Sequence, residues 1–178
     1  MQKIAAFISV PKCASKTMLI MYDMGENRSC DKISDSYIIY ENHQRLSILE
    51  EKYDLSDMFM FTFVRNPYDR VVSDFLWTMR ININHGRHFL KCPEPNRCGF
   101  KSFEEFIYFI RDHFILNGSS SWKCWCHFRP QHEFIYDNTG KLLVDFVGKT
   151  ESFSDDILKL KQEHDIQVDN IQMNVTRP

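Results

Sequence analysis

The chain has 178 residues, 43% of them hydrophobic, and a formal net charge of −2 at pH 7. This length predicts one domain, residues 1–178, with one substantial core. The near-neutral charge argues against nucleic acid or an anionic membrane as a general partner, so any cationic site must be local. Because neither a membrane span nor a targeting signal is recognisable, we expect a cytoplasmic protein, or a Golgi lumenal one if this is a truncated catalytic domain.

The first half of the chain alternates between strand and helix patterns. Short apolar runs predict strands at 3–10, 37–40 and 58–64, and helical spacing predicts helices at 17–24 and 43–53. A further helix should begin directly after Arg65, because Asn66 suits the N-cap and Pro67 the first helical position. This order predicts an α/β protein with a P-loop-like, three-layer fold, in which helices flank a central parallel sheet.

The second half contains two irregular polar stretches, 82–101 and 117–132, which we expect to be loops. Between them, Ser102 and Glu105 form a capping-box pattern that opens a helix packed into the core. Residues 133–148 resemble a hairpin that turns at 138–140. Residues 152–165 predict a last amphipathic helix.

The six cysteines leave two interpretations open. Cys92 and Cys98 bracket a proline-rich turn and would pair in an oxidising compartment, whereas a cytosolic chain would keep them reduced. Cys124, Cys126 and His127 suggest zinc, but paired zinc-binding cysteines are usually separated by two to four residues. Buried or disulfide-bonded cysteines are therefore the favoured interpretation.

The stretch "PKCASKT", residues 11–17, follows the first predicted strand. It offers backbone N–H groups, the lysines Lys12 and Lys16, and the hydroxyls of Ser15 and Thr17 at a helix start, which together favour binding of an anion. The stretch lacks the glycines of a Walker A loop, and this argues against ATP or GTP hydrolysis. Ala14 and Ser15 suggest a cradle whose backbone needs no positive φ.

A second candidate anion site follows the strand at 58–64. Arg65 stands at the strand end, and Ser73 lies about two turns into the next helix. A guanidinium and a hydroxyl so placed would bind a further phosphate through charge-assisted hydrogen bonds. In the alternative interpretation, Arg65 pairs with a carboxylate and Ser73 is a surface residue.

Together, "PKCASKT" and "FVRNPYDRVVSDF" resemble the 5′-phosphosulfate loop and the 3′-phosphate motif of sulfotransferases that use 3′-phosphoadenosine 5′-phosphosulfate (PAPS). Residues 127–153 and the final "MNVTRP" are similar to later segments of the carbohydrate O-sulfotransferase branch, which includes heparan 2-O-sulfotransferases and microbial relatives. The resemblance implies in-line transfer of a sulfuryl group to a hydroxyl of an oligosaccharide or small glycosylated acceptor. The product would be 3′-phosphoadenosine 5′-phosphate (PAP), and no metal is needed.

The resemblance also implies a set of site residues. Those expected to bind the donor are Lys12, Cys13, Ala14, Ser15, Lys16, Thr17, Met18, Arg65, Ser73, Asn174, Thr176 and Arg177. Lys12 would also neutralise charge on the departing nucleotide. Those expected to bind the acceptor are Arg87, Arg129, Gln131 and His132, although Arg129 and Gln131 could instead brace the fold.

The acceptor hydroxyl must lose a proton, so a general base is needed. His43 is our choice because it follows the second strand, at the carboxyl edge of the sheet, and Glu41 is the alternative. Two other functions compete with a sulfotransferase: a P-loop-type nucleotide kinase and a non-catalytic nucleotide-binding module.

Overall fold

The computed structural model describes residues 4–21, 32–33, 37–40, 43–85, 100–116 and 125–166. The chain divides into two compact units. The sheet unit is drawn from Met1–Asn66 and Pro130–Pro178, and the helical unit is Pro67–Arg129.

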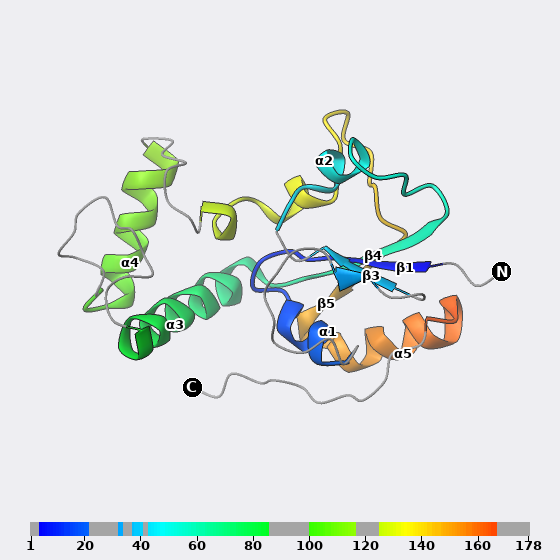
Figure 1. Ribbon diagram of the computed structural model, residues 1–178. Helices are drawn as coiled ribbons and strands as arrows, with labels where there is room; N and C mark the ends of the chain where they lie inside the picture. The colour runs from blue at the N-terminus through cyan, green and yellow to red at the C-terminus, as the bar shows by residue number, and fades with distance from the viewer. Residues whose placement is uncertain are drawn as a thin grey trace. The chain divides into compact units, whose positions relative to one another are not determined.

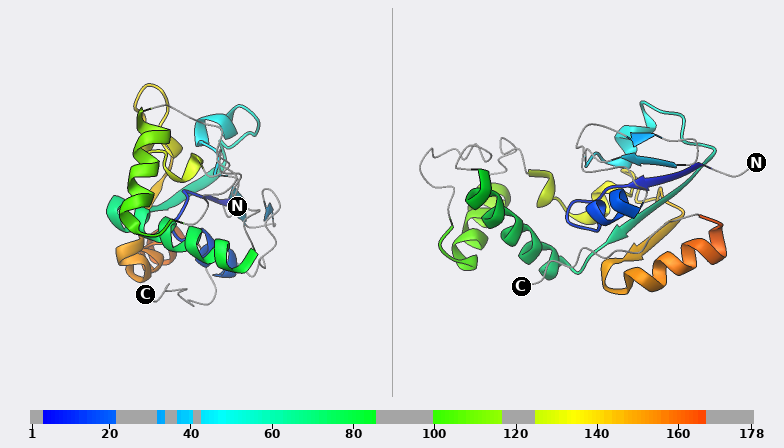
Figure 2. Two further views of the ribbon diagram at one scale, coloured as in Figure 1. Left: turned by 90° about the vertical axis from the view of Figure 1, so that its left-hand side faces the viewer. Right: turned by 60° about the horizontal axis from the view of Figure 1, so that its bottom comes forward.

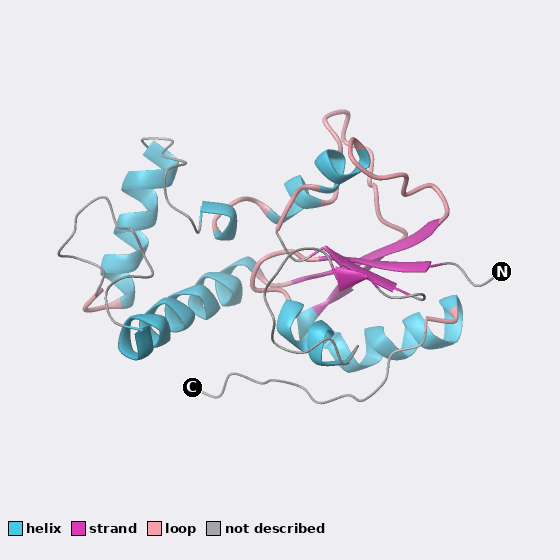
Figure 3. Cartoon of the chain, viewed as in Figure 1, coloured by secondary structure: helices cyan, strands magenta, loops and turns pink. Residues whose placement is uncertain are grey.

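The sheet unit is built on one sheet. Its strands are β1 (Ile4–Ile8), β2 (Lys32–Ile33), β3 (Tyr37–Tyr40), β4 (Met58–Val64) and β5 (Phe146–Lys149). They lie in the order β2-β3-β1-β4-β5, with β3, β1, β4 and β5 parallel and β2 antiparallel to β3 (Figure 3). The predicted α/β fold with a parallel sheet is therefore confirmed.

Helices cover both faces of this sheet. The helices α1 (Ser15–Met21) and α5 (Phe153–His164) lie on one side, and α2 (Leu46–Glu50) lies on the other (Figures 1 and 2). Short 3₁₀ turns at Gln131–Phe134 and Thr150–Ser152 connect the remaining segments. The three predicted strands and the helices of this unit are present. Strands β3 and β4 have the predicted bounds, whereas β1 and the helices differ from the prediction by a few residues at their ends.

The core of the sheet unit follows from strand alternation. On one face, Phe7, Phe61 and Phe63 are buried against residues of α1 and α5. The rings of Phe63 and Phe153 are 4.6 Å apart, and a Cβ added to Gly148 of β5 would lie 2.5 Å from Phe63 Cε1. A glycine is thus required for β5 to pack this closely beside the Phe63 ring.

The helical unit contains α3 (Pro67–His85) and α4 (Phe103–Ile110), with a π-helical turn at Arg111–Leu116 and a 3₁₀ turn at Trp125–His127. The predicted cap of α4 is confirmed, because Ser102 Oγ accepts the Glu105 amide N–H at 3.1 Å. Phe106 is fully buried and lies 5.9 Å from Phe128 in an aromatic cluster. Among the helices that the structure describes, none combines the length and apolar character needed to cross a membrane.

Two local predictions are wrong. Residues 82–85 continue helix α3 instead of opening a loop, because helical spacing persists to His85. The predicted hairpin is reduced to one bridge between Tyr136 and Leu142. Its second half leaves that pairing, and Phe146–Lys149 joins the sheet as β5, parallel to β4.

Candidate functional site

The candidate site lies where three parallel strands end. The chain passes from β1 to β3 on one side of β1 and then to β4 on the other side. Such a reversal of strand order creates a crevice at the carboxyl ends of the strands, where ligands bind in open α/β sheets. The segment 9–14, which we term the β1 loop, is therefore flanked by the ends of β3 and β4.

The backbone of the β1 loop differs from the expectation. Its φ is +66° at Lys12 and +67° at Ala14, but it is not positive at the intervening Cys13. The prediction that no positive φ is needed is wrong. Left-handed backbone costs about 1–2 kcal/mol at a residue with a Cβ, and such strain concentrates at functional sites. Alternation of this kind can turn successive N–H groups toward one concavity, the anion-binding arrangement called a nest.

Hydrogen bonds within the loop hold this conformation. The Cys13 amide donates to the Val10 carbonyl at 3.2 Å, and the Met18 amide donates to Ala14 at 2.9 Å. The Met18 side chain is fully buried in the core. Lys12, Ser15 and Thr17 are half-buried and Lys16 is exposed, so the predicted lysines and hydroxyls retain access to the surface.

Ser9 links the β1 loop to the segment after β3. Its Oγ lies 2.7 Å from Ser15 Oγ and 3.2 Å from His43 Nδ1, while its carbonyl oxygen lies 3.0 Å from the same Nδ1. Ser9 is 1% exposed. We did not predict a role for Ser9, although a hydroxyl inside the apolar run of residues 7–10 is a signal that could have identified it.

The environment of His43 determines its tautomer. A carbonyl oxygen can only accept, so the contact with Ser9 O places a proton on Nδ1. In the neutral ring the lone pair is then on Nε2. His43 itself has a φ of +50°, a conformation uncommon for residues other than glycine. The ring is thus oriented through Nδ1, as a positioned base requires.

Gln131 links the β1 loop to the end of β4. Its Oε1 accepts the Arg65 amide N–H at 2.9 Å and the Cys13 thiol at 3.1 Å, and its Nε2 donates to the Arg65 carbonyl at 2.7 Å. Of the two roles left open by the sequence, these contacts support the bracing one.

Arg65 lies half-buried at the end of β4, beside a carboxylate. Glu151 Oε1 accepts the Asn66 amide N–H at 2.6 Å. Burial raises the pKa of Glu151, but hydrogen bonds from the Asn66 and Glu151 amides and from the Thr150 side chain, together with the charge of Arg65, more than offset the effect and keep the pKa below its ordinary value. One element of the alternative interpretation of Arg65, a carboxylate nearby, is therefore present.

In the helical unit, Ser73 is half-buried on α3. The neighbouring Arg70 is 7% exposed and donates from Nη1 to the Arg129 carbonyl at 3.0 Å. His127 Nδ1 lies 2.6 Å from Asp74 Oδ1. In the parts of the chain that the structure describes, no three His, Cys, Asp or Glu side chains converge as a metal site.

The remaining predicted residues lie outside the described segments. They are Glu41, Arg87, Asn174, Thr176 and Arg177, together with Cys92, Cys98 and Cys124. Cys13 and Cys126 are described, and neither forms a disulfide. Burial raises the pKa of the Cys126 thiol, which makes it a weak nucleophile near neutral pH.

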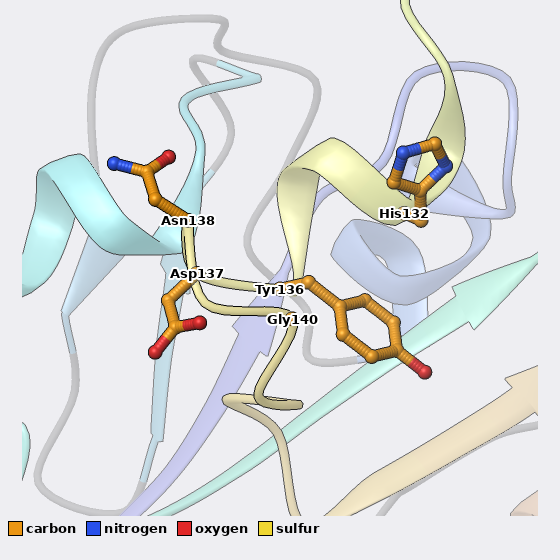
Figure 4. A pocket seen from close by; sticks show the side chains of 5 residues that line it. All are labelled: His132, Tyr136, Asp137, Asn138 and Gly140. Carbon is orange, nitrogen blue, oxygen red and sulfur yellow. The ribbon is translucent and has the colours of Figure 1, made fainter.

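A shallow pocket of about 500 Å³ is lined by residues that follow Gln131 in the sequence, between His132 and Gly140. Figure 4 shows His132 and the Tyr136 ring on one side of its turn, with Asp137 and Asn138 pointing away on the other. Asp137 Oδ1 accepts the amide N–H groups of Thr139 and Lys141, so its carboxylate stabilises the turn. The predicted acceptor residue His132 is therefore exposed at a pocket in the sheet unit.

Comparison with known proteins supports the resemblance seen in the motifs. A family model described as "Sulfotransferase family" matches residues 3–176. Searches of curated proteins and of solved structures found no match.

Proposed function

The chain belongs to the sulfotransferase family, and from this premise we propose that it transfers the sulfuryl group of PAPS to a hydroxyl of a carbohydrate or of a glycosylated small molecule. Sulfotransferases of this family generally use PAPS as the donor. The same proposal assigns residues to the two phosphate groups of the donor, to the general base and to the binding of the acceptor.

The observation that carries the donor assignment is the shape of the β1 loop. Left-handed backbone at Lys12 and Ala14 supports an anion nest in a loop without glycine, and the half-buried Ser15 hydroxyl stands at its end. These residues would hold the 5′-phosphate, with Lys16 and Thr17 beside them. Strained backbone of this kind persists only where its surroundings impose it, which favours a functional role.

The 3′-phosphate would be bound by Arg65 together with Ser73, as the motif implies. The hydrogen bonds from Gln131 to both polar groups of the Arg65 peptide support a fixed starting point for this side chain. The guanidinium at the end of this side chain suits bidentate contact with phosphate. Recognition of the 3′-phosphate would allow the protein to discriminate PAPS from adenosine nucleotides that lack this group.

The donor supplies an activated sulfuryl group, whose sulfur–oxygen bond to the nucleotide breaks as the acceptor oxygen bonds to sulfur. His43 would take the proton of the acceptor hydroxyl on Nε2, because Nδ1 is already a donor to Ser9. Lys12 would offset the negative charge that develops on the departing phosphate. Catalysis of this kind depends mainly on positioning and electrostatics.

We assign the acceptor to the surface around the pocket at His132 and Tyr136. His132 and the 37% exposed Tyr136 offer an aromatic face with a polar neighbour, a combination common in small-molecule sites. The described lining of this pocket includes no lysine or arginine. The resemblance implies Arg87 and Arg129 as the residues that would bind an acidic acceptor.

Calorimetry and a transfer assay test the proposal. We expect PAP to bind without magnesium and ATP to bind weakly, and ³⁵S-labelled PAPS to modify at least one member of a panel of neutral and acidic sugars. Binding of ATP that requires magnesium would indicate a kinase, and PAP binding without any transfer would indicate a non-catalytic module.

Variants separate the residue roles. Lys12→Ala and Arg65→Ala should each weaken PAP binding by more than about tenfold, because each removes a charge-assisted contact. His43→Ala should retain PAP affinity and lower turnover by roughly 10² or more. Lys52→Ala, at an exposed lysine after α2, is the matched control and should change neither quantity.

A further inference from the structure

One side chain, Gln131, contacts both loops assigned above to the two ends of the donor. It stands at the start of the 3₁₀ turn Gln131–Phe134 and is half-buried. Its carboxamide oxygen lies 2.9 Å from the Arg65 amide nitrogen and 3.1 Å from Cys13 Sγ, and its nitrogen lies 2.7 Å from the Arg65 carbonyl oxygen. Both ends of the carboxamide are therefore engaged by the protein.

The contact with Arg65 resembles the pairing of a neighbouring strand. In a sheet, one residue can be paired through both its N–H and its C=O, and the Gln131 amide provides the same acceptor and donor just beyond β4. This fixes the Arg65 peptide plane after the last residue of the strand. The direction of the Arg65 Cα–Cβ bond, from which the side chain starts, is fixed with it.

The contact with Cys13 acts on the other loop. Cys13 is fully buried and lies between the left-handed residues Lys12 and Ala14. A hydrogen bond from its thiol to Gln131 Oε1 anchors the part of the loop that carries the backbone strain. The same oxygen therefore constrains the nest and the residue at the end of β4.

We propose that Gln131 is a positioning residue that sets the distance between the 5′- and 3′-phosphate sites and thereby selects a donor phosphorylated at both ends. The inference rests on the proposed function. A ligand that occupies both sites gains affinity from their fixed spacing, whereas a ligand that occupies one site does not. Loss of Gln131 should therefore weaken the binding of PAP more than the binding of adenosine 5′-phosphate.

The test compares these two nucleotides by calorimetry in wild type, Gln131→Met and Gln131→Glu. Met has a similar length but no amide, and Glu keeps the acceptor while losing the donor to the Arg65 carbonyl. Because Gln131→Met removes the hydrogen bonds to both loops, we expect the PAP Kd to rise about tenfold in this variant, and the Kd of adenosine 5′-phosphate to rise less than about threefold. Gln162→Met, at an exposed position on α5, is the matched control.

Cys13→Ala gives a second reading if the Gln131 variants fail to fold. It removes the link to the β1 loop and leaves the pairing with Arg65 in place. We expect the ratio of PAP affinity to adenosine 5′-phosphate affinity to fall in this variant too, because PAP binding should again weaken more. A merely structural role would weaken both nucleotides alike or neither.

The outcomes distinguish the two proposals. Wild-type protein that does not bind PAP would overturn the proposed function and this inference with it. Wild-type protein that binds PAP, together with folded variants at positions 131 and 13 that keep the wild-type ratio of affinities, would overturn the inference alone. A reduced ratio in these variants, with Gln162→Met unchanged, would support it.

Discussion

The substitution Ser9→Ala tests whether the Ser9 hydroxyl positions the base. It removes an Oγ that lies 2.7 Å from Ser15 Oγ and 3.2 Å from His43 Nδ1. The Ser9 carbonyl remains 3.0 Å from Nδ1, so the tautomer of His43 should persist. A neutral hydrogen bond contributes about 0.5–1.5 kcal/mol, and at 1.36 kcal/mol per factor of ten this predicts a roughly three- to tenfold lower kcat.

The assay is steady-state transfer from ³⁵S-labelled PAPS to an acceptor found in the panel, with PAP affinity measured in parallel. We expect PAP affinity to change less than about threefold, because Ser15 Oγ also donates to the Val10 carbonyl. In a His43→Gln background, Ser9→Ala should cause little further loss, since the group it positions is gone. Equal losses in both backgrounds would refute this reasoning. Ser56→Ala, which removes an exposed hydroxyl bonded to Asp54, serves as the control.

Three predictions concern stability, each measured by urea unfolding. Ala14→Gly should leave the unfolding free energy unchanged or raise it by up to about 1 kcal/mol because it relieves left-handed strain, whereas the control Ala5→Gly in β1 should lower it by about 1 kcal/mol or more; equal losses would contradict the loop conformation. Gly148→Ala should cost about 1–3 kcal/mol, since its Cβ would meet the Phe63 ring, and wild-type stability would contradict this packing. Burial raises the pKa of Asp156, but its hydrogen bonds lower the pKa overall. Asp156→Asn should therefore lower the free energy of unfolding by its full amount at pH 7 and by progressively less below about pH 4. A difference that does not depend on pH would contradict this linkage.

The sequence predicts the segment from β4 into α3 well because several local signals agree there. The strand at 58–64 has the predicted bounds, and α3 begins at Pro67 as expected. An apolar run specifies a strand buried on both faces, and Asn66-Pro67 then requires an abrupt change to helix. The position of Arg65 at the strand end follows from these two features alone.

The conformation of the β1 loop could not be predicted in the same way. A chain without glycine suggests ordinary backbone angles, yet Lys12 and Ala14 have positive φ. Their conformation depends on partners distant in sequence, and the Gln131 contact with Cys13 is one of them. Residue preferences carry no information about such contacts, so residue type and position predict the proposed anion site, but they do not predict its shape.

The segment 133–148 shows a similar limit. Its turn residues predict a hairpin, and Gly140 does have a φ of +84°. However, only Tyr136 and Leu142 pair across the turn, while the Asp145 amide donates to the Met60 carbonyl at 2.7 Å and leads the chain onto β4. Pairing with the buried edge of the parallel sheet thus prevails over continued pairing with the adjacent strand.

The contacts through Ser9 and Gln131 explain how the β1 loop, which has no glycine, keeps a strained shape. Left-handed conformations at Lys12 and Ala14 together cost about 2–4 kcal/mol, and the local bond from Cys13 to Val10 is worth only about 1 kcal/mol. The further bonds through Ser9 and Gln131 are needed to offset this cost, and they come from the segment after β3 and from the turn after Pro130. Because those same segments present His43 and fix the backbone of Arg65, the contacts that hold the loop would also align the proposed base and the proposed second anion site with it.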